Sequence, residues 1–295
     1  MTRTMIPKPV TELRCELGES PVWQASIGRL AWVDLLAGQL HSAAWISGGL
    51  KDLRTLQHDA PIGAAAPRRN GGWIVAAGSG FARVSVEGDV TPFADAEPGS
   101  AGRLRMNDGK CDPRGRFLAG SMAYDAAAGQ GTLFQLSPDG KVKALIEGSS
   151  ISNGLGWTND GRTFFWIDTA AGQVNAFDYD LDTGNLSGRR ILLQTAQGES
   201  PDGMTVDAED GLWIAFWGSS VVRRFDAAGS VSHTVEFPVT QPTCPVLGGP
   251  TGTTLFITTA YHGLTDTDRD KQPLAGSVFA CEVDVPGQPT AVFAG

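Results

Sequence analysis

Short apolar segments, each opened by a turn glycine, recur along the whole chain. Six glycines open these segments: Gly28, Gly71, Gly115, Gly161, Gly211 and Gly252. The intervals between them are 43, 44, 46, 50 and 41 residues. A second, more amphipathic segment follows each one, as "GQLHSAAW" follows "GRLAWVDL". Short apolar runs bounded by glycine are typical of strands, and no stretch carries a sustained helical period, so the pattern predicts sheet throughout.

A repeat of this length has room for four strands, which is the size of one propeller blade. Six such units predict an all-β protein, a six-bladed β-propeller with four-stranded antiparallel blades around a central channel. No stretch has the composition of a linker, so we expect residues 1–295 to form one domain. The alternatives are a β-sandwich and a two-domain all-β protein.

One residue in each repeat lies eight or nine positions before the turn glycine, where the innermost strand is expected to open. These six residues are Glu19, Ile62, Asn107, Asn153, Asp202 and Cys244. Blades related by rotation about one axis place equivalent residues in a ring. We therefore expect the six side chains to encircle one mouth of the channel.

Three of these side chains have the chemistry of a metal site, namely Glu19, Asn153 and Asp202. Oxygen donors without histidine or cysteine suit a divalent cation such as calcium, magnesium or manganese, and two carboxylates neutralise its charge. Taken singly, Asn-Gly and Asp-Gly pairs are common turn formers. The prediction of a metal site therefore depends on their equivalent positions in the repeat.

Chain direction predicts which connections lie near this mouth, because neighbouring strands of a blade alternate in direction. Two connections that return there are long, over residues 121–130 and 260–275. They bring four residues within reach of a ligand: Tyr124, Asp125, Tyr261 and His262. The stretch "DTDRD" over residues 266–270 lacks the glycine and terminal glutamate of an EF-hand loop, so we expect a solvated turn.

Composition excludes several classes of partner. Hydrophobic residues make up 41% of the chain, and the formal charge of -9 argues against nucleic acid, which is bound by clustered lysine and arginine. No run approaches a membrane span and the first residues lack a signal-peptide core, so we expect no membrane partner and a cytoplasmic protein. The four cysteines form no CxxC pair, which favours reduced structural thiols. The oligomeric state stays open.

The chain also resembles a known family, that of senescence-marker protein, regucalcin and gluconolactonase, which are six-bladed propellers. The resemblance runs in order over nearly the whole chain. It is carried by these stretches: "LGESPVW", "RLRMNDGKCDPRGRFLAGSM", "ISNGLGW", "FDYDLDTG", "SPDGMTVDAEDGLWIAFWG" and "QPLAGSVF". It implies a metal-dependent lactonase that converts a sugar lactone into the sugar acid, with the metal polarising the carbonyl and activating water. The implied metal ligands are Glu19, Asn153 and Asp202.

The resemblance further implies that Asp202 is the catalytic base, although a carboxylate bound to a cation is a weak base. The residues implied to contact the sugar are Arg105 and Asn107, which precede "DGK", and Asp125 after "GSM". Tyr124 beside it, which we also expect to contact substrate, departs from the family pattern and leaves the preferred sugar open.

Calcium is the first choice of metal, with zinc, manganese, magnesium and iron as alternatives. Two other functions remain open: a calcium-binding regulator without turnover, and an esterase or phosphotriesterase that uses the same metal.

Overall fold

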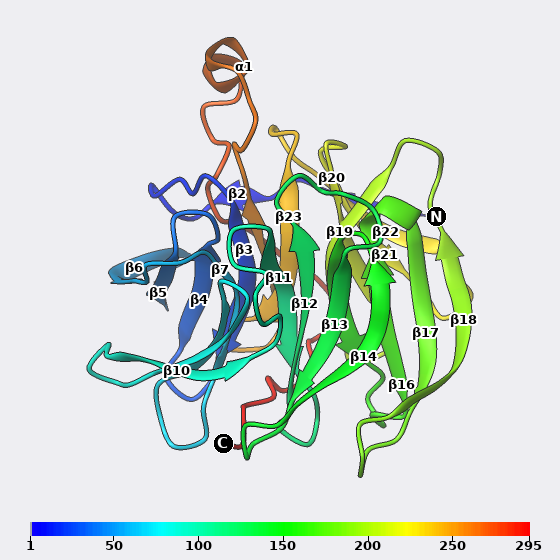
Figure 1. Ribbon diagram of the computed structural model, residues 1–295. Helices are drawn as coiled ribbons and strands as arrows, with labels where there is room; N and C mark the ends of the chain where they lie inside the picture. The colour runs from blue at the N-terminus through cyan, green and yellow to red at the C-terminus, as the bar shows by residue number, and fades with distance from the viewer. Residues whose placement is uncertain (1) are drawn as a thin grey trace.

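Six small sheets surround a central channel in the computed structural model, which describes residues 2–295 (Figure 1). The innermost strands of the six blades are β3 (Gly18–Gln24), β7 (Ile62–Pro67), β11 (Leu104–Cys111), β15 (Ser152–Trp157), β19 (Ser200–Val206) and β23 (Pro242–Gly248). These strands contact one another in chain order, and β23 contacts β3, so the ring of blades is closed. The prediction of a six-bladed β-propeller is confirmed, and the sandwich alternative is wrong.

The remaining strands follow outward from the channel in chain order. The second strands are β4 (Arg29–Asp34), β8 (Trp73–Ala77), β12 (Phe117–Ala123), β16 (Thr163–Asp168), β20 (Leu212–Trp217) and β24 (Thr254–Thr259). The third strands are β5 (Gln39–Ile46), β9 (Gly80–Val84), β13 (Gly131–Leu136), β17 (Gln173–Tyr179), β21 (Val221–Phe225) and β25 (Phe279–Glu282). The predicted apolar segments form the second strands, and the amphipathic segments form the third strands.

The outermost strands show how the ring is closed. Five of them come from their own repeat: β6 (Gly49–Gln57), β10 (Val90–Asp95), β14 (Val142–Ser149), β18 (Leu186–Gln194) and β22 (Val231–Glu236). The sixth is β2 (Lys8–Pro9), from the start of the chain, which pairs with β25 in the last blade. Strand β1 (Arg3–Met5) adds to the fifth blade in parallel with β22. The N-terminal segment therefore joins the last two blades.

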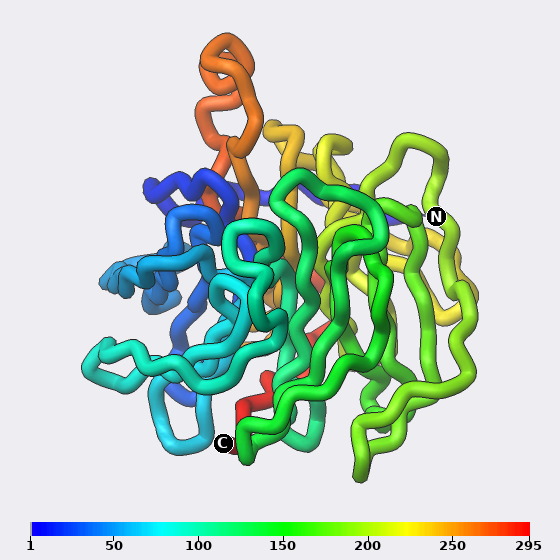
Figure 2. The backbone as a smooth tube through the Cα atoms, in the orientation of Figure 1, coloured from blue at the N-terminus to red at the C-terminus, as the bar shows by residue number. Residues whose placement is uncertain are grey.

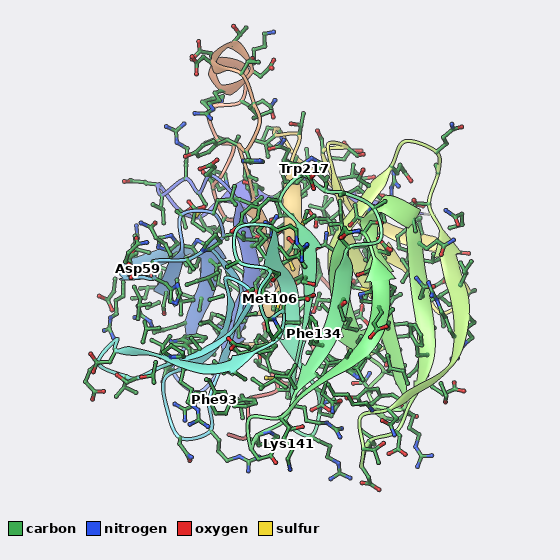
Figure 3. All side chains as sticks on the ribbon, in the orientation of Figure 1. Asp59, Phe93, Met106, Phe134, Lys141 and Trp217 are labelled. Carbon is green, nitrogen blue, oxygen red and sulfur yellow. The ribbon has the colours of Figure 1, made fainter. Side chains whose placement is uncertain are left out.

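The hydrophobic core is divided among the six interfaces between blades. Each of six clusters joins buried residues of two neighbouring blades. Between the second and third blades, for example, Ile74 packs with Met106 and Phe134, the last two of which are labelled in Figure 3. Second strands such as β4 and β12 are buried along their whole length. This burial on both faces explains why most of their residues are apolar.

The C-terminal segment, residues 286–295, crosses the end of the channel away from the predicted ring. Its backbone bonds to several blades: the Phe293 N–H donates to the Pro67 carbonyl and the Ala294 N–H to the Gly115 carbonyl, at 2.8 and 2.9 Å. The Gln288 amide donates to the Trp157 carbonyl at 3.0 Å. Figure 2 shows this red segment at the end of the molecule opposite to the projecting orange loop.

One expectation about the long connections is wrong. Residues 266–270 were expected as a solvated turn, but they lie in a short helix, α1 (Asp266–Lys271), which projects from the body of the molecule (Figure 1). Thr265 caps it by accepting from the Asp268 N–H at 3.2 Å, while basic residues end it. The helix buries no residue, so the expectation of solvation is correct.

All four cysteines are free, and Cys15, Cys111 and Cys244 are buried. Among residues 2–295, no helix has the length and apolar character needed to cross a membrane.

We expect Phe293→Ala to destabilise the protein by about 3–5 kcal/mol, because the ring is fully buried and packs edge-on against Phe93. The measurement is the free energy of unfolding in guanidinium chloride. Val86→Ala, at a side chain that is 74% exposed, is the control and should change little. If both variants lose an equally small amount of unfolding free energy, the C-terminal segment has no stabilising role.

Candidate metal centre

Every innermost strand carries a β-bulge where the ring residue lies. In the first blade Glu19 pairs with Val33, whereas the next pair is Val22 with Ala31, so β3 holds one extra residue. The other five blades have a register shift at the corresponding place. A bulge turns side chains out of the regular alternation of a strand and increases its local twist. The six bulges therefore give the ring positions their common geometry.

Close packing explains the glycines that follow two of the predicted ligands. A Cβ atom on Gly154 would lie 2.5 Å from Ile167 and 2.8 Å from the Asp202 carbonyl oxygen. A Cβ atom on Gly203 would lie 2.5 Å from the Cys244 side chain. The Asn-Gly and Asp-Gly pairs thus let neighbouring innermost strands approach each other at the ring.

The structure places all six ring residues on innermost strands, with little exposure. Glu19, Asn107, Asn153 and Asp202 are 5–8% exposed, and Ile62 and Cys244 complete the set. The one difference in placement concerns Asn107, which lies in the middle of β11 and not at its start. The strand begins earlier there because Leu104 and Arg105 also pair with β12.

Hydrogen bonds connect the predicted substrate residues to a predicted metal ligand. The Arg105 guanidinium donates to Asn107 Oδ1 at 2.7 Å. Asn107 Nδ2 in turn donates to Asn153 Oδ1 at 2.9 Å and to the Ser152 carbonyl at 3.0 Å. These contacts join the third and fourth blades, and they bring Arg105, Asn107 and Asn153 into one cluster.

The two carboxylates of the ring are in an unfavourable environment for negative charge. Burial raises the pKa of the Glu19 carboxyl well above its usual range, and Asp202 and Asp108 raise it further. Burial and the nearby Asp108 likewise raise the pKa of Asp202. Arg105 opposes both shifts, while its own pKa is lowered to about 10 by burial. Like charges buried close together favour the binding of a cation.

The donor set fits a hard divalent cation. Glu19 and Asp202 offer carboxylate oxygens and Asn153 offers an amide oxygen, which are the ligands that such ions take in proteins. Within residues 2–295, no group of three or more histidine, cysteine, aspartate or glutamate side chains has the geometry of a metal site. The predicted set differs from such a group in taking an amide, that of Asn153, as its third protein ligand.

Two further polar residues at the centre were missed in the sequence. Asp108, next to Asn107, is buried; its Oδ1 accepts from the Gly109 N–H, but Oδ2 has no partner in the described structure. Thr169 accepts from Asn153 Nδ2 at 2.9 Å. The chain-direction argument could have found Thr169, because it lies in the connection between β16 and β17, on the ring side of the fourth blade.

The four residues of the long connections that were predicted near a ligand differ in what they contact. Tyr124 lies close enough to Arg105 to affect its pKa, and 46% of its side chain is exposed. Asp125 is exposed and accepts from the Ala127 N–H at 3.0 Å. Tyr261 packs under Arg269, and His262 contacts Glu16 at 3.0 Å. Of these four, the structure connects Tyr124 with the cluster at the ring.

Behind the ring, the channel widens into a cavity of about 390 Å³. Its polar lining includes Ser20, Asp108 and Lys110, and the Lys110 ammonium donates to the Met204 carbonyl at 2.7 Å. Gln288 and Thr290 of the C-terminal segment line its far end. The C-terminal segment therefore lies across this far mouth of the channel.

The fold and the candidate site define the class of protein as a six-bladed propeller with buried carboxylate and amide side chains at one mouth of its channel. Residues 17–261 match the family model described as "SMP-30/Gluconolactonase/LRE-like region". The chain is 36% identical over 289 residues to regucalcin of Xenopus laevis, with 95% of each chain covered. The chain therefore belongs to the SMP-30/gluconolactonase family, and the resemblance seen in the sequence is confirmed.

Solved structures agree with this assignment. The crystal structure of a calcium-binding protein, regucalcin, from Agrobacterium tumefaciens has a TM-score of 0.94 and 26% identity, covering 100% of this chain and 99% of that one. A gluconolactonase from Xanthomonas campestris has a TM-score of 0.72 and 19% identity, covering 92% and 87%. At that lower identity, the second comparison shows the shared fold alone.

We expect Asp202→Asn to raise the melting temperature of the metal-free protein, because it removes one of the like charges that are buried together with Glu19 and Asp108. The gain should be larger at pH 8 than at about pH 5, since carboxyls whose pKa is raised on folding destabilise the native state as they lose protons. Differential scanning calorimetry with excess chelator measures it. If the variant melts at a lower temperature than the wild type at pH 8, the buried carboxylates do not destabilise the metal-free protein by repulsion.

Proposed function

We propose that this protein is a metal-dependent lactonase that hydrolyses a sugar (aldono)lactone to the corresponding sugar acid. The observation that carries the proposal is that two buried carboxylates lie at one mouth of the channel near the Arg105–Asn107 pair, which is itself hydrogen-bonded to the Asn153 amide. Membership of a family whose description includes gluconolactonase supports it. The partner is therefore a small molecule.

The metal proposed here is divalent, held by Glu19, Asn153 and Asp202. When bound, it would supply Lewis-acid polarisation of the lactone carbonyl and lower the pKa of water. Calcium is the first candidate, because the Agrobacterium relative is described as calcium-binding. Zinc, manganese, magnesium and iron are the alternatives for the same oxygen donors.

Arg105 and Asn107 are proposed to orient the lactone. One nitrogen of Arg105, Nη1, is held by the Met106 carbonyl and Asn107 Oδ1, at 3.1 and 2.7 Å. The other guanidinium N–H groups make no hydrogen bond to residues 2–295, so they are available for sugar hydroxyls or for the oxyanion that develops during attack. Because Nη1 is fixed and the guanidinium group is planar, its remaining donors are oriented before the substrate arrives.

Asp202 is proposed as the catalytic base as well as a ligand. Water attacks the carbonyl carbon and passes one proton to the Asp202 carboxylate; the ring C–O bond then breaks as the protonated Asp202 returns that proton to the leaving alkoxide. The backbone N–H of Gly203 lies near this carboxylate and, with Arg105, opposes the rise of its pKa. Burial favours proton uptake by this carboxylate, whereas a bound cation opposes it.

We expect Asp202→Ala to lower kcat/KM by at least about 10²-fold, through loss of the base, the metal or both. A pH-indicator assay of acid release from a panel of sugar lactones, with and without chelator, measures the effect. Glu236→Ala, at an exposed carboxylate on β22, is the control. Full activity of Asp202→Ala with metal still bound overturns the assignment.

The calcium-binding description of the Agrobacterium relative also favours a second candidate, a calcium-binding regulator without turnover. The same panel separates the two. Calcium binding without acid release from any lactone supports the regulator. Acid release from other esters alone supports a related esterase that uses the same residues.

Tyr124 and Asp125 are both proposed substrate contacts, and the geometry favours Tyr124. Its position near Arg105 lets the ring and hydroxyl meet the same ligand, whereas Asp125 is turned to the Ala127 N–H. We expect Tyr124→Ala to raise KM about 10-fold, the equivalent of one lost hydrogen bond, and Asp125→Ala to change it little. Steady-state kinetics on the best lactone of the panel measures both. The reverse order would show that Asp125 is the main contact.

A further inference from the structure

Thr169 lies where the fourth blade returns to the ring, at the start of the 3-10 turn η1 (Thr169–Ala171). Its backbone is fixed by two hydrogen bonds: its N–H donates to the Ile151 carbonyl at 3.1 Å, and its carbonyl accepts from the Gly172 N–H at 3.0 Å. The side chain is therefore presented to the ring by a turn that does not depend on the hydroxyl group.

The Thr169 hydroxyl ends a directional series of hydrogen bonds. A guanidinium only donates, so Arg105 requires the oxygen of Asn107 on its side. Asn107 then presents its NH₂ group to Asn153 Oδ1. Asn153 Nδ2 donates to Thr169 Oγ1 at 2.9 Å, and the hydroxyl donates to the Pro201 carbonyl at 2.7 Å.

The end of the series is as restrictive as its start. The Pro201 carbonyl only accepts, so the hydroxyl proton of Thr169 points to it and a lone pair faces Asn153. Inverting the Asn153 amide would place its NH₂ group against that of Asn107 and its oxygen against the Thr169 lone pair. Both ends of the series therefore hold the Asn153 oxygen on the side of Asn107, away from Thr169.

This orientation matters because an amide can offer a cation only its oxygen. Asn153 Oδ1 has two lone pairs, and the hydrogen bond from Asn107 uses one of them. The second lone pair of Asn153 Oδ1 accepts no hydrogen bond from residues 2–295 and is available to a cation. The same hydroxyl bonds to the residue before Asp202, so one side chain contacts the amide of the fourth blade and the strand that carries the carboxylate of the fifth.

We propose that Thr169 is a positioning residue of the metal site, which holds the amide oxygen of Asn153 toward the cation and ties it to the strand of Asp202. The inference rests on the proposed function only in requiring that Asn153 binds a divalent metal. Residues that orient metal ligands in this way commonly contribute a large part of the affinity for the metal.

The test is the affinity for calcium and for manganese, measured by isothermal titration calorimetry on the full chain. Thr169→Val keeps the shape of the side chain and removes both hydrogen bonds, and we expect the Kd for metal to rise about 10–100-fold. Thr169→Ser keeps the hydroxyl and should restore the affinity of the wild type. This rescue separates orientation of the ligand from simple packing.

Thr195→Val is the matched control, because its hydroxyl bonds to the Gly172 carbonyl at the other end of the same turn and touches no ring residue. It should bind metal like the wild type. The melting temperature of each variant with excess chelator checks that the fold is intact.

Two results would overturn the inference and they are distinguishable. Unchanged metal affinity in Thr169→Val, with normal binding by the wild type, contradicts the role of Thr169 alone. Failure of the wild type to bind any divalent cation contradicts the proposed function, and the inference with it.

Discussion

The burial of two negative charges at one end of the channel is the constraint on which the rest of this structure depends. Glu19 and Asp202 come from the first and fifth blades, and each is almost fully removed from solvent. Burial of unpaired charge is costly, and it raises the pKa of both carboxyls. Arg105 is the nearby cation that opposes this rise for Glu19 and for Asp202. A propeller keeps the carboxylates together because each is attached to a strand packed between two blades, so that repulsion cannot separate them without disrupting a core cluster.

The closure of the ring therefore serves the site as much as the fold. The N-terminal strands β1 and β2 join the last two blades, and the C-terminal segment bonds across the far mouth. Opening at either place would let the innermost strands move apart. The six bulges act on a finer scale, because they set the direction of the ring side chains on strands that closure has already fixed. Rigidity of this kind orients ligands before a metal or substrate arrives.

The candidate site has a buried part at the ring and an exposed part on the connections. Of the proposed ligands, Asn153 is tied to the Arg105–Asn107 pair by hydrogen bonds, whereas Glu19 and Asp202 are held by their burial on innermost strands, so this part of the site has little freedom to change. Tyr124 is half exposed on a long connection; its backbone N–H bonds to the Arg103 carbonyl, but its hydroxyl makes no hydrogen bond to residues 2–295. A fold shared by regucalcin and gluconolactonase does not decide the substrate. On this protein the preference for one lactone over another is therefore expected to depend on the connections and not on the ring.

The sequence by itself was enough to predict the blades, because strand pattern and turn glycines are local and repeat six times. It also predicted which residues occupy the ring, since equivalent offsets in a closed repeat must meet around one axis. The helix α1 was missed because its local signal, the Thr265 cap, was not recognised. The sequence did not reveal features that depend on non-local packing: the pairing of β2 with β25, the path of residues 286–295, and the orientations of Tyr124 and Asp125. Thr169 shows the reason most clearly. Its partners Asn153 and Pro201 lie 16 and 32 residues away in the chain, and only the folded ring brings them to one hydroxyl group.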